Sequence, residues 1–192
     1  MSLNKGNPQA VEATDDAELV DRCKSELPYI TKSYEILLSR YETTVFRFCL
    51  AYLRQAADAE EVTQDVFLRV FHHIKGFEKR SSFKTWLLRI AQNQCSRRYG
   101  QIKKHRELNE KLREDQATVD EAAPLQMTEG LVMQTLLELG KDAREILSLR
   151  HLSELPLNEV AEILGLSASA AKMRHHRAVK QFRELYKKNR PL

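Results

Sequence analysis

The stretch from Phe77 to Arg106 concentrates positive charge beside aromatic rings, and no carboxylate occurs between Glu78 and Glu107. Lysine and arginine hold phosphates, whereas aromatic faces stack on unpaired bases. The pattern therefore favours binding of single-stranded nucleic acid, although a solvated basic face over a helical core is the commoner use of such a segment. Its cations are Lys79, Arg80, Lys84, Arg89, Arg97, Arg98, Lys103, Lys104 and Arg106, and its aromatic residues are Phe77, Phe83, Trp86 and Tyr99.

Histidine and cysteine could serve metal or redox chemistry, so a zinc or redox enzyme is one alternative. The sequence contains neither an HExxH motif nor a CxxC pair, and metal centres need ligands at such spacings. Widely spaced cysteines indicate reduced thiols in a cytoplasm. We therefore expect no metal, no cofactor and no catalytic residue among His72, His73, His175, His176, Cys23, Cys49 and Cys95.

Composition places the chain among globular proteins. It has 192 residues, 42% hydrophobic content and a formal net charge of +4, which allows one large or two small domains. The most apolar run, 45–53, is too short for a membrane span and contains Arg47. The N-terminus lacks a signal-peptide pattern, so we expect a soluble, cytoplasmic protein.

Helical spacing of apolar residues dominates the first half, after a flexible lead-in at 1–14. A short helix is expected to begin at Asp15 or Asp16, and a long amphipathic helix covers 29–54. Asp58 and Glu61 resemble a capping box before a third helix. Gly76 ends that helix, and Ser81 or Ser82 caps the next.

The third helix has a polar stripe opposite its apolar face, made by Glu61, Gln64, Asp65 and Leu68. A leucine among carboxylates suits a protein-docking surface, although a single surface leucine is also common.

The region 107–128 loses apolar periodicity and predicts a linker, which divides the chain into domains at 15–106 and 129–192. Further helices follow, and no strand pattern of useful length occurs. The sequence thus predicts an all-α fold of two small helical domains joined by a linker.

A helix-turn-helix is predicted near the C-terminus. Apolar residues line a short helix ending at Leu164, Gly165 allows a tight turn, and Ser167 can cap the longer helix that follows. The second helix turns a basic face outward, which suits a DNA major groove. The alternative is a plain helical hairpin with a solvated face. The outward residues are Lys172, Met173, His176, Arg177 and Lys180.

Together these motifs resemble the extracytoplasmic-function sigma factors, the small promoter-specificity subunits of bacterial RNA polymerase. The resemblance spans 16–188 and rests on three segments: DAEEVTQDVF from Asp58, the phenylalanine and TWL-RIA-N pattern from Phe77 to Asn93, and GLSASAAKMRHHRA from Gly165. It implies a region-2-like bundle that docks on polymerase and melts the −10 element, and a region-4-like helix-turn-helix domain that reads the −35 duplex.

The resemblance also assigns residues. Docking on the clamp helices of the largest polymerase subunit falls to Asp58, Glu61, Gln64, Asp65 and Leu68. Recognition of the −10 element falls to Arg69, His73, Phe77, Lys79, Arg80, Arg89, Asn93 and Arg97. Recognition of the −35 element falls to Ser169, Lys172, Met173, Arg174, His176, Arg177 and Lys180. The flap of the second-largest subunit and an anti-sigma factor are further expected partners.

Three departures from the family pattern lie in the last segment: Ala170-Ala171 replaces threonine-valine, His175 replaces leucine or isoleucine, and Val179 replaces a frequent arginine. Of the properties that the resemblance implies, the −35 base preference is therefore the one that can least be carried over from the family to this chain. A stand-alone helix-turn-helix regulator, with a sensing or dimerising N-terminal domain, is the main alternative. It leaves the polar stripe and the basic aromatic segment without a role.

Overall fold

The computed structural model describes residues 14–112 and 127–190, and all its regular elements in those ranges are helical. The first group comprises α2 (Asp16–Glu26), α3 (Lys32–Leu53), α4 (Ala56–His73), the 3-10 turn η1 (Ile74–Gly76) and α5 (Phe83–Leu112). The second comprises α6 (Met127–Glu138), α7 (Lys141–Leu147), the π-helical turn η2 (Ser148–Leu152), α8 (Leu157–Leu164) and α9 (Ala168–Asn189). The predicted all-α fold is confirmed.

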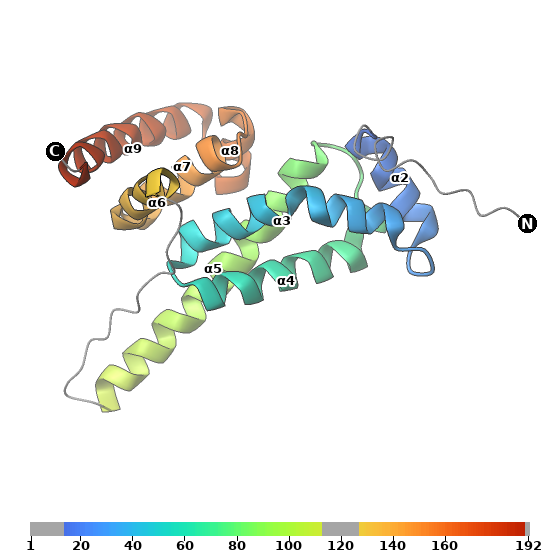
Figure 1. The fold of residues 1–192 in the computed structure, drawn as a ribbon, viewed down its shortest axis with the longest axis horizontal. Coiled ribbons are helices and arrows are strands. Elements are labelled where there is room, and N and C mark those ends of the chain that lie inside the picture. Colours follow the sequence, from blue (N-terminus) through green and yellow to red (C-terminus); the bar gives the residue numbers. More distant parts are fainter. Residues whose placement is uncertain (1–13, 113–126, 191–192) are drawn as a thin grey trace, which may run out of the picture.

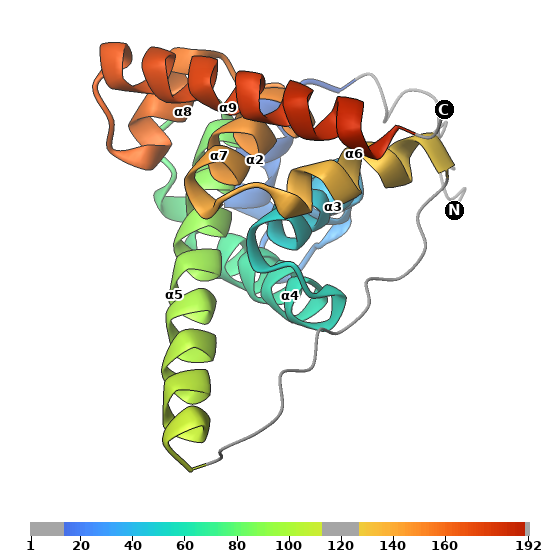
Figure 2. The same cartoon turned by 90° about the vertical axis from the view of Figure 1, so that its left-hand side faces the viewer.

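The first group is a bundle in which α3 lies between α2, α4 and α5 (Figure 1). Its centre is built from residues that recur every three or four positions, and Phe48, Val66, Val70 and Leu87 are fully buried there. Figure 2 shows α5 continuing as a straight rod beyond the bundle. With 30 residues, this helix is about 45 Å long.

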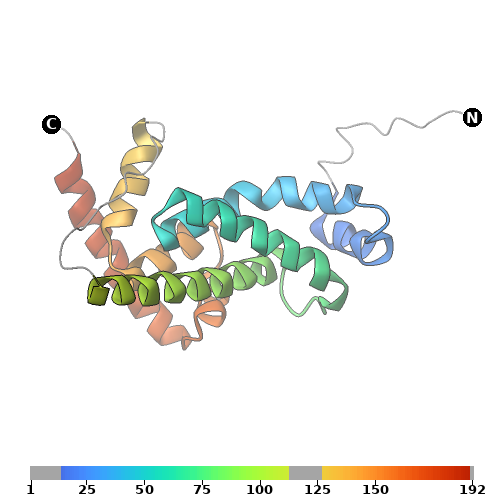
Figure 3. The same ribbon diagram turned by 90° about the horizontal axis from the view of Figure 1, so that it is seen from below.

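The second group packs α9 across α6, α7 and α8. Ile146, Leu149, Val160 and Ala171 form its buried centre. Seen from below, this group lies beside one end of the first bundle, while α2 and the α2–α3 loop lie at the other end (Figure 3). The two groups touch directly, since α3 contacts α7 and η2 and α5 contacts α8.

The predicted starts of two helices were wrong. The long helix begins at Lys32 rather than Tyr29, and Tyr29 and Ile30 project into solvent from the loop before it. The helix α4 begins at Ala56, since two alanines favour helix there. Asp58 consequently lies inside the first turn and forms no capping box.

The predicted linker was also too long at both ends. The helix α5 continues to Leu112 and α6 begins at Met127. Lysine, arginine, glutamate and leucine in 103–112 are good helix formers, and they extend a helix without any apolar periodicity. The rest of that linker, 113–126, lies outside the described residues, as does most of the predicted lead-in.

Candidate nucleic-acid interface

The loop between η1 and α5 is built around Phe77. Its ring is buried, 4.9 Å from the ring of Trp86 and 6.2 Å from that of Phe83. Lys24 of α2 donates a hydrogen bond of 2.5 Å to the Phe77 carbonyl, and its ammonium lies 5.8 Å from the centre of the ring. The ring that was predicted to meet a base is thus part of the core, and stacking on a base would need this loop to open.

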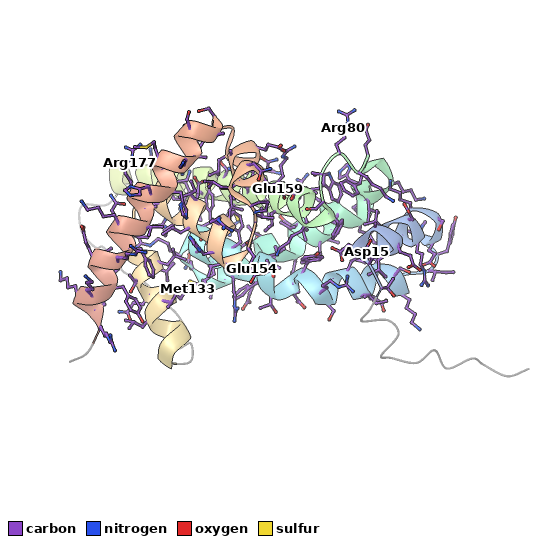
Figure 4. The ribbon with its side chains drawn as sticks, turned by 90° about the horizontal axis from the view of Figure 1, so that it is seen from above. Asp15, Arg80, Met133, Glu154, Glu159 and Arg177 are labelled. Carbon is purple, nitrogen blue, oxygen red and sulfur yellow. The ribbon has the colours of Figure 1, made fainter. Side chains whose placement is uncertain are left out.

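Cations line the outside of the same loop. Lys79 has a positive φ of 57°, an unfavourable conformation for a lysine, and its ammonium is held 2.7 Å from Asp21. Arg80 is largely exposed, as Figure 4 shows, and pairs with Glu78 at 2.6 Å. Both therefore lie on the surface around Phe77, with a carboxylate partner each.

The remaining −10 candidates lie on α4 and α5. His73 ends α4, and Asn93 and Arg97 are exposed on α5, whereas Arg69 is half-buried. Arg89 is half-exposed and lies 3.4 Å from Glu162 of α8. Ser82 caps α5 by accepting a hydrogen bond from the Thr85 amide at 3.1 Å, which confirms one of the two predicted caps.

The predicted docking stripe on α4 has an exposed part and an internally bonded part. Gln64, Asp65 and Leu68 are exposed, Leu68 to 59%. Asp58 is buried, and Arg98 of α5 donates to it at 2.8 Å and to Glu61 at 2.7 Å. The hydrogen bond to Asp58 raises the pKa of Arg98 above its ordinary value. Two of the five predicted docking residues, Asp58 and Glu61, therefore tie α4 to α5.

The helix-turn-helix is confirmed. Gly165 takes the left-handed conformation, with φ 63°, that a tight turn requires. The hydroxyl of Ser167 then caps α9 by accepting from the Ala170 amide at 3.2 Å. Ser169 is exposed, 3.1 Å from the Ser167 hydroxyl.

Side chains on the outer face of α9 are exposed at Lys172, Met173, His176, Arg177 and Lys180. Figure 4 shows Arg177 projecting outward from α9.

Arg174 differs from these neighbours. Its guanidinium lies 2.8 Å from Glu145 and 3.3 Å from Asp142, and it donates to the Asp142 carbonyl at 2.9 Å. Because Glu145 is buried, Arg174 binds α9 to α7, and a contact to DNA would have to break these bonds.

An apolar groove of about 310 Å³ runs between α6, η2 and α9. Such a groove accepts apolar side chains of a helix from a partner. Its walls are formed by Val132, Leu136, Leu147, His151, Leu152, Val179, Phe182 and Arg183.

The histidines and cysteines make two pairs. Nε2 of His151 lies 2.9 Å from Nε2 of His175, and burial lowers the pKa of both imidazoles. The buried thiol of Cys95 donates a hydrogen bond of 3.4 Å to the Sγ atom of Cys49, and both cysteines are free of disulfides. Over 14–112 and 127–190, no three metal-binding side chains gather.

Sequence reasoning missed the charged groups that join elements. Arg98 was one of many cations in its segment, and nothing in its position singled it out. Arg144 is 4% exposed although it lies on a short helix of mixed polarity. Glu159 and Glu162 are three residues apart on α8, so they share one face of that helix, opposite its apolar side. This spacing could have indicated a second contact surface.

Comparison with known proteins supplies the family. Sigma-70 region 2 matches residues 37–105, and Sigma-70, region 4 matches 129–182. The RNA polymerase sigma factor CarQ of Myxococcus xanthus is 31% identical over 156 residues, covering 80% of this chain and 88% of that protein. The ECF RNA polymerase sigma-E factor of Haemophilus influenzae is 29% identical, covering 88% and 93%.

Two solved structures share the fold. CnrH in complex with the cytosolic domain of CnrY has a TM-score of 0.65 and 21% identity, over 91% of this chain and 99% of that one. The sigma factor RpoE in complex with the anti-sigma factor NepR from Bartonella quintana has a TM-score of 0.65 and 24% identity, over 83% of this chain and 99% of that one.

Within the described ranges, no helix has both the length and the apolar character to cross a bilayer.

Proposed function

The chain belongs to the extracytoplasmic-function sigma factors, which bind core RNA polymerase and direct promoter-specific initiation, and on that premise we propose how its surfaces divide this work. Docking falls to α4, −10 recognition to the Phe77 loop with α5, and −35 recognition to α9. The chain contributes no catalytic group, because phosphodiester synthesis belongs to the polymerase. It works in the cytoplasm, where polymerase meets the promoter.

The observation that carries the docking proposal is the exposure of Leu68 beside Asp65 and Gln64. An apolar side chain ringed by acceptors suits a partner surface that offers both an apolar contact and arginines. The clamp helices of the largest subunit are such a partner in this family. Because Asp58 is buried against Arg98, we propose that it supports the docking surface rather than touching the partner.

The test is Asp65→Arg in the full chain, with binding to core polymerase measured by pull-down and by fluorescence anisotropy. Truncating one member of a desolvated charge pair costs about 2–5 kcal/mol, and reversal costs at least as much. We expect core binding to fall more than tenfold with helical content unchanged. Unaltered core binding would mean that docking lies elsewhere.

Glu60→Arg is the matched control, since Glu60 is exposed on α4 outside the stripe. Glu61→Arg is unsuitable as a first variant. It would place a second guanidinium against Arg98, so it would disturb the fold as well as the surface.

Promoter recognition follows from the two basic surfaces. Asn93 offers a donor and an acceptor to a base edge, and the cations around it suit the strand's phosphates. On α9, Arg177 can bond two acceptors of guanine in the major groove. We propose that Phe77 leaves its packed position when a base is captured, because its ring is buried in this structure.

The apolar groove of the second domain suits a helix of the flap of the second-largest subunit. Leu136, Leu152 and Phe182 supply apolar walls, and Arg183 at the rim suits an acidic neighbour. CnrH and RpoE were solved with CnrY and with the anti-sigma factor NepR. We propose that an anti-sigma factor also binds this chain and competes for such surfaces.

A further inference from the structure

Two histidines that are far apart in the sequence meet in the second domain. His151 lies in η2 and His175 lies on α9, 24 positions later, yet their Nε2 atoms are 2.9 Å apart. The ring centres are 5.1 Å apart, so the two nitrogens face each other. The expectation that neither histidine binds a metal rested on sequence spacing, and the fold brings together two imidazoles that spacing did not connect.

The element that carries His151 is an uncommon one. The π-helical turn η2 is closed by a hydrogen bond of 2.9 Å from the Ser153 amide to the Ser148 carbonyl. Such turns are rare and occur frequently at functional sites. Here the turn brings His151 to α9 while leaving it exposed to solvent, and His175 is half-buried. An ion from solvent can therefore reach both nitrogens.

Both imidazoles can act as ligands at neutral pH. Burial lowers the pKa of His151 and of His175, and the nearby Arg150 contributes to both shifts. The rings are therefore neutral, and one Nε2–H donates to the lone pair of the other Nε2. An ion bonded to both Nε2 atoms replaces this hydrogen bond, and the proton moves to Nδ1 of the ring that donated it.

The spacing of the two nitrogens is close to that of a zinc site. With imidazole–zinc bonds of about 2.0–2.1 Å, two nitrogens of a tetrahedral site lie about 3.3 Å apart. The pair at 2.9 Å would have to widen by only about 0.4 Å. Rotation of the two rings can supply this change, because the terminal torsion of histidine is broad. Water completes the coordination, as in zinc sites that keep an open position.

The surroundings of the pair select against hard cations. Arg150 and His176 both act on the two rings through positive charge, which repels any cation. Mg²⁺ and Ca²⁺ prefer oxygen ligands, whereas imidazole suits zinc, copper and nickel. Only an ion that forms strong bonds to imidazole therefore gains more from the two nitrogens than it loses by repulsion.

We propose that His151 and His175 form a two-histidine site for a divalent transition-metal ion, with Zn²⁺ as the reference ion, and that a bound ion ties η2 to α9. An ion that binds only the folded chain stabilises it, so the stability of the second domain would rise with metal concentration. The site goes beyond the proposed function. It needs neither polymerase nor promoter DNA, so the failure of one proposal leaves the other standing.

Calorimetric titration of the full chain with Zn²⁺ tests the site directly. We expect the wild type to bind one Zn²⁺ with a dissociation constant in the micromolar range, and His151→Asn/His175→Asn to lose this binding. Titration with Mg²⁺ should show no binding, since the pair offers no oxygen ligand. A wild type that binds no Zn²⁺, or a double variant that binds it equally well, would overturn the site.

His72→Asn/His105→Asn is the matched control. Both residues are exposed, on α4 and α5, and their replacement removes the same number of imidazoles. This variant should bind Zn²⁺ as the wild type does. If it loses as much Zn²⁺ binding as His151→Asn/His175→Asn, zinc attaches to surface histidines in general and the proposed site is refuted.

Thermal unfolding of the full chain shows whether the ion stabilises the fold. At a Zn²⁺ concentration ten times the measured dissociation constant, the ratio of folded to unfolded chain should rise about 11-fold, and Tm by roughly 3–10 °C. His175→Leu removes one ligand but keeps an apolar side chain at this half-buried position, so it should fold and show no zinc-dependent shift. An equal shift in the wild type and in His175→Leu would contradict the proposal.

X-ray absorption at the zinc edge identifies the ligands. Imidazoles and water give nitrogen or oxygen neighbours at about 2.0–2.1 Å, whereas thiolates give sulfur at about 2.3 Å. The three native cysteines are buried, so we expect no sulfur neighbour. A spectrum dominated by sulfur would place the ion on a cysteine and overturn the assignment to His151 and His175.

Discussion

The two basic surfaces of this protein carry similar charges but hold them differently. Around Phe77 and on α5, four cations each have a carboxylate within 4 Å: Lys79, Arg80, Lys84 and Arg89. On α9, Lys172, Arg177 and Lys180 form no ion pair with the parts of the chain that are described. The proposed −35 surface on α9 therefore has cations without an internal carboxylate partner, whereas the proposed −10 surface would have to exchange internal partners for nucleic acid. Charge content alone does not distinguish these two situations.

Phe77→Ala should have the largest effect. The ring is buried against Trp86 and Phe83, so its removal leaves a cavity and should lower the free energy of unfolding by about 3–5 kcal/mol. The equivalent change on the other surface, Met173→Ala, removes a side chain that is 56% exposed and should cost less than about 0.5 kcal/mol. Urea unfolding followed by circular dichroism measures both. Equal stabilities would mean that the Phe77 loop is open in solution.

Arg177→Ala should weaken binding to −35 duplex by about 1–3 kcal/mol and relax preference at one base pair. Selection of binding sites from a randomised −35 library measures this change. Arg174→Ala is the informative companion, since it should lower stability by removing the partner of Glu145. A selected motif unchanged by Arg177→Ala would show that another residue reads the base.

Salt dependence should separate the two surfaces more finely. Lys180→Ala removes an unpaired cation, so the salt slope for duplex should fall by about 0.9. Arg80→Ala removes a cation already paired with Glu78, and the slope for single strands should fall by less than about 0.7. Binding constants measured over a series of sodium chloride concentrations give both slopes. If both variants reduced the salt slope by the full amount expected for one unpaired cation, the difference in ion pairing between the two surfaces would be contradicted.

Acid should weaken the second domain slightly. Burial lowers the pKa of His151 and of His175, with the neighbouring imidazole and Arg150 contributing. The unfolded chain then binds more protons, so stability is complete above pH of about 6.5 and falls as pH drops toward the lowered values. Thermal melts across this range should show the decline in wild type and less of it in His151→Asn/His175→Asn. An identical stability profile in the wild type and the double variant would exclude the His151–His175 pair as the cause.

Features set by neighbouring residues could be predicted from sequence. The turn at Gly165, the caps at Ser82 and Ser167, and the exposure of Leu68 depend on local spacing and backbone preference, and the structure bears them out. The start of α3 was missed because the apolar Tyr29 and Ile30 fit helical spacing. Pattern alone cannot tell that they lie in the loop before the helix.

Features set by distant residues could not be predicted. Arg98 and Asp58 are 40 positions apart, and Arg89 and Glu162 are 73 apart. Each pair depends on how whole helices pack. From the sequence alone, many other cations and carboxylates could equally have been predicted to pair. The burial of Phe77 is similar, since an aromatic residue in a basic loop fits both a stacking platform and a small core. The residue assignments for docking and for both promoter elements remain predictions.

The bond between Arg98 and Glu61 gives docking and strand recognition a common element. Arg98 lies on α5 next to Arg97, and Glu61 belongs to the docking stripe. If polymerase takes Glu61 as a partner, Arg98 loses one of its two carboxylates and keeps the other, Asp58, at 2.6 Å. Docking would then change the charge balance beside the proposed −10 surface, and the two binding events would share a coupling free energy. Such coupling is reciprocal: the factor by which docking tightens strand binding is also the factor by which the strand tightens docking. Once polymerase leaves the promoter and the strand is lost, affinity for polymerase would fall by that same factor, which favours recycling of the subunit.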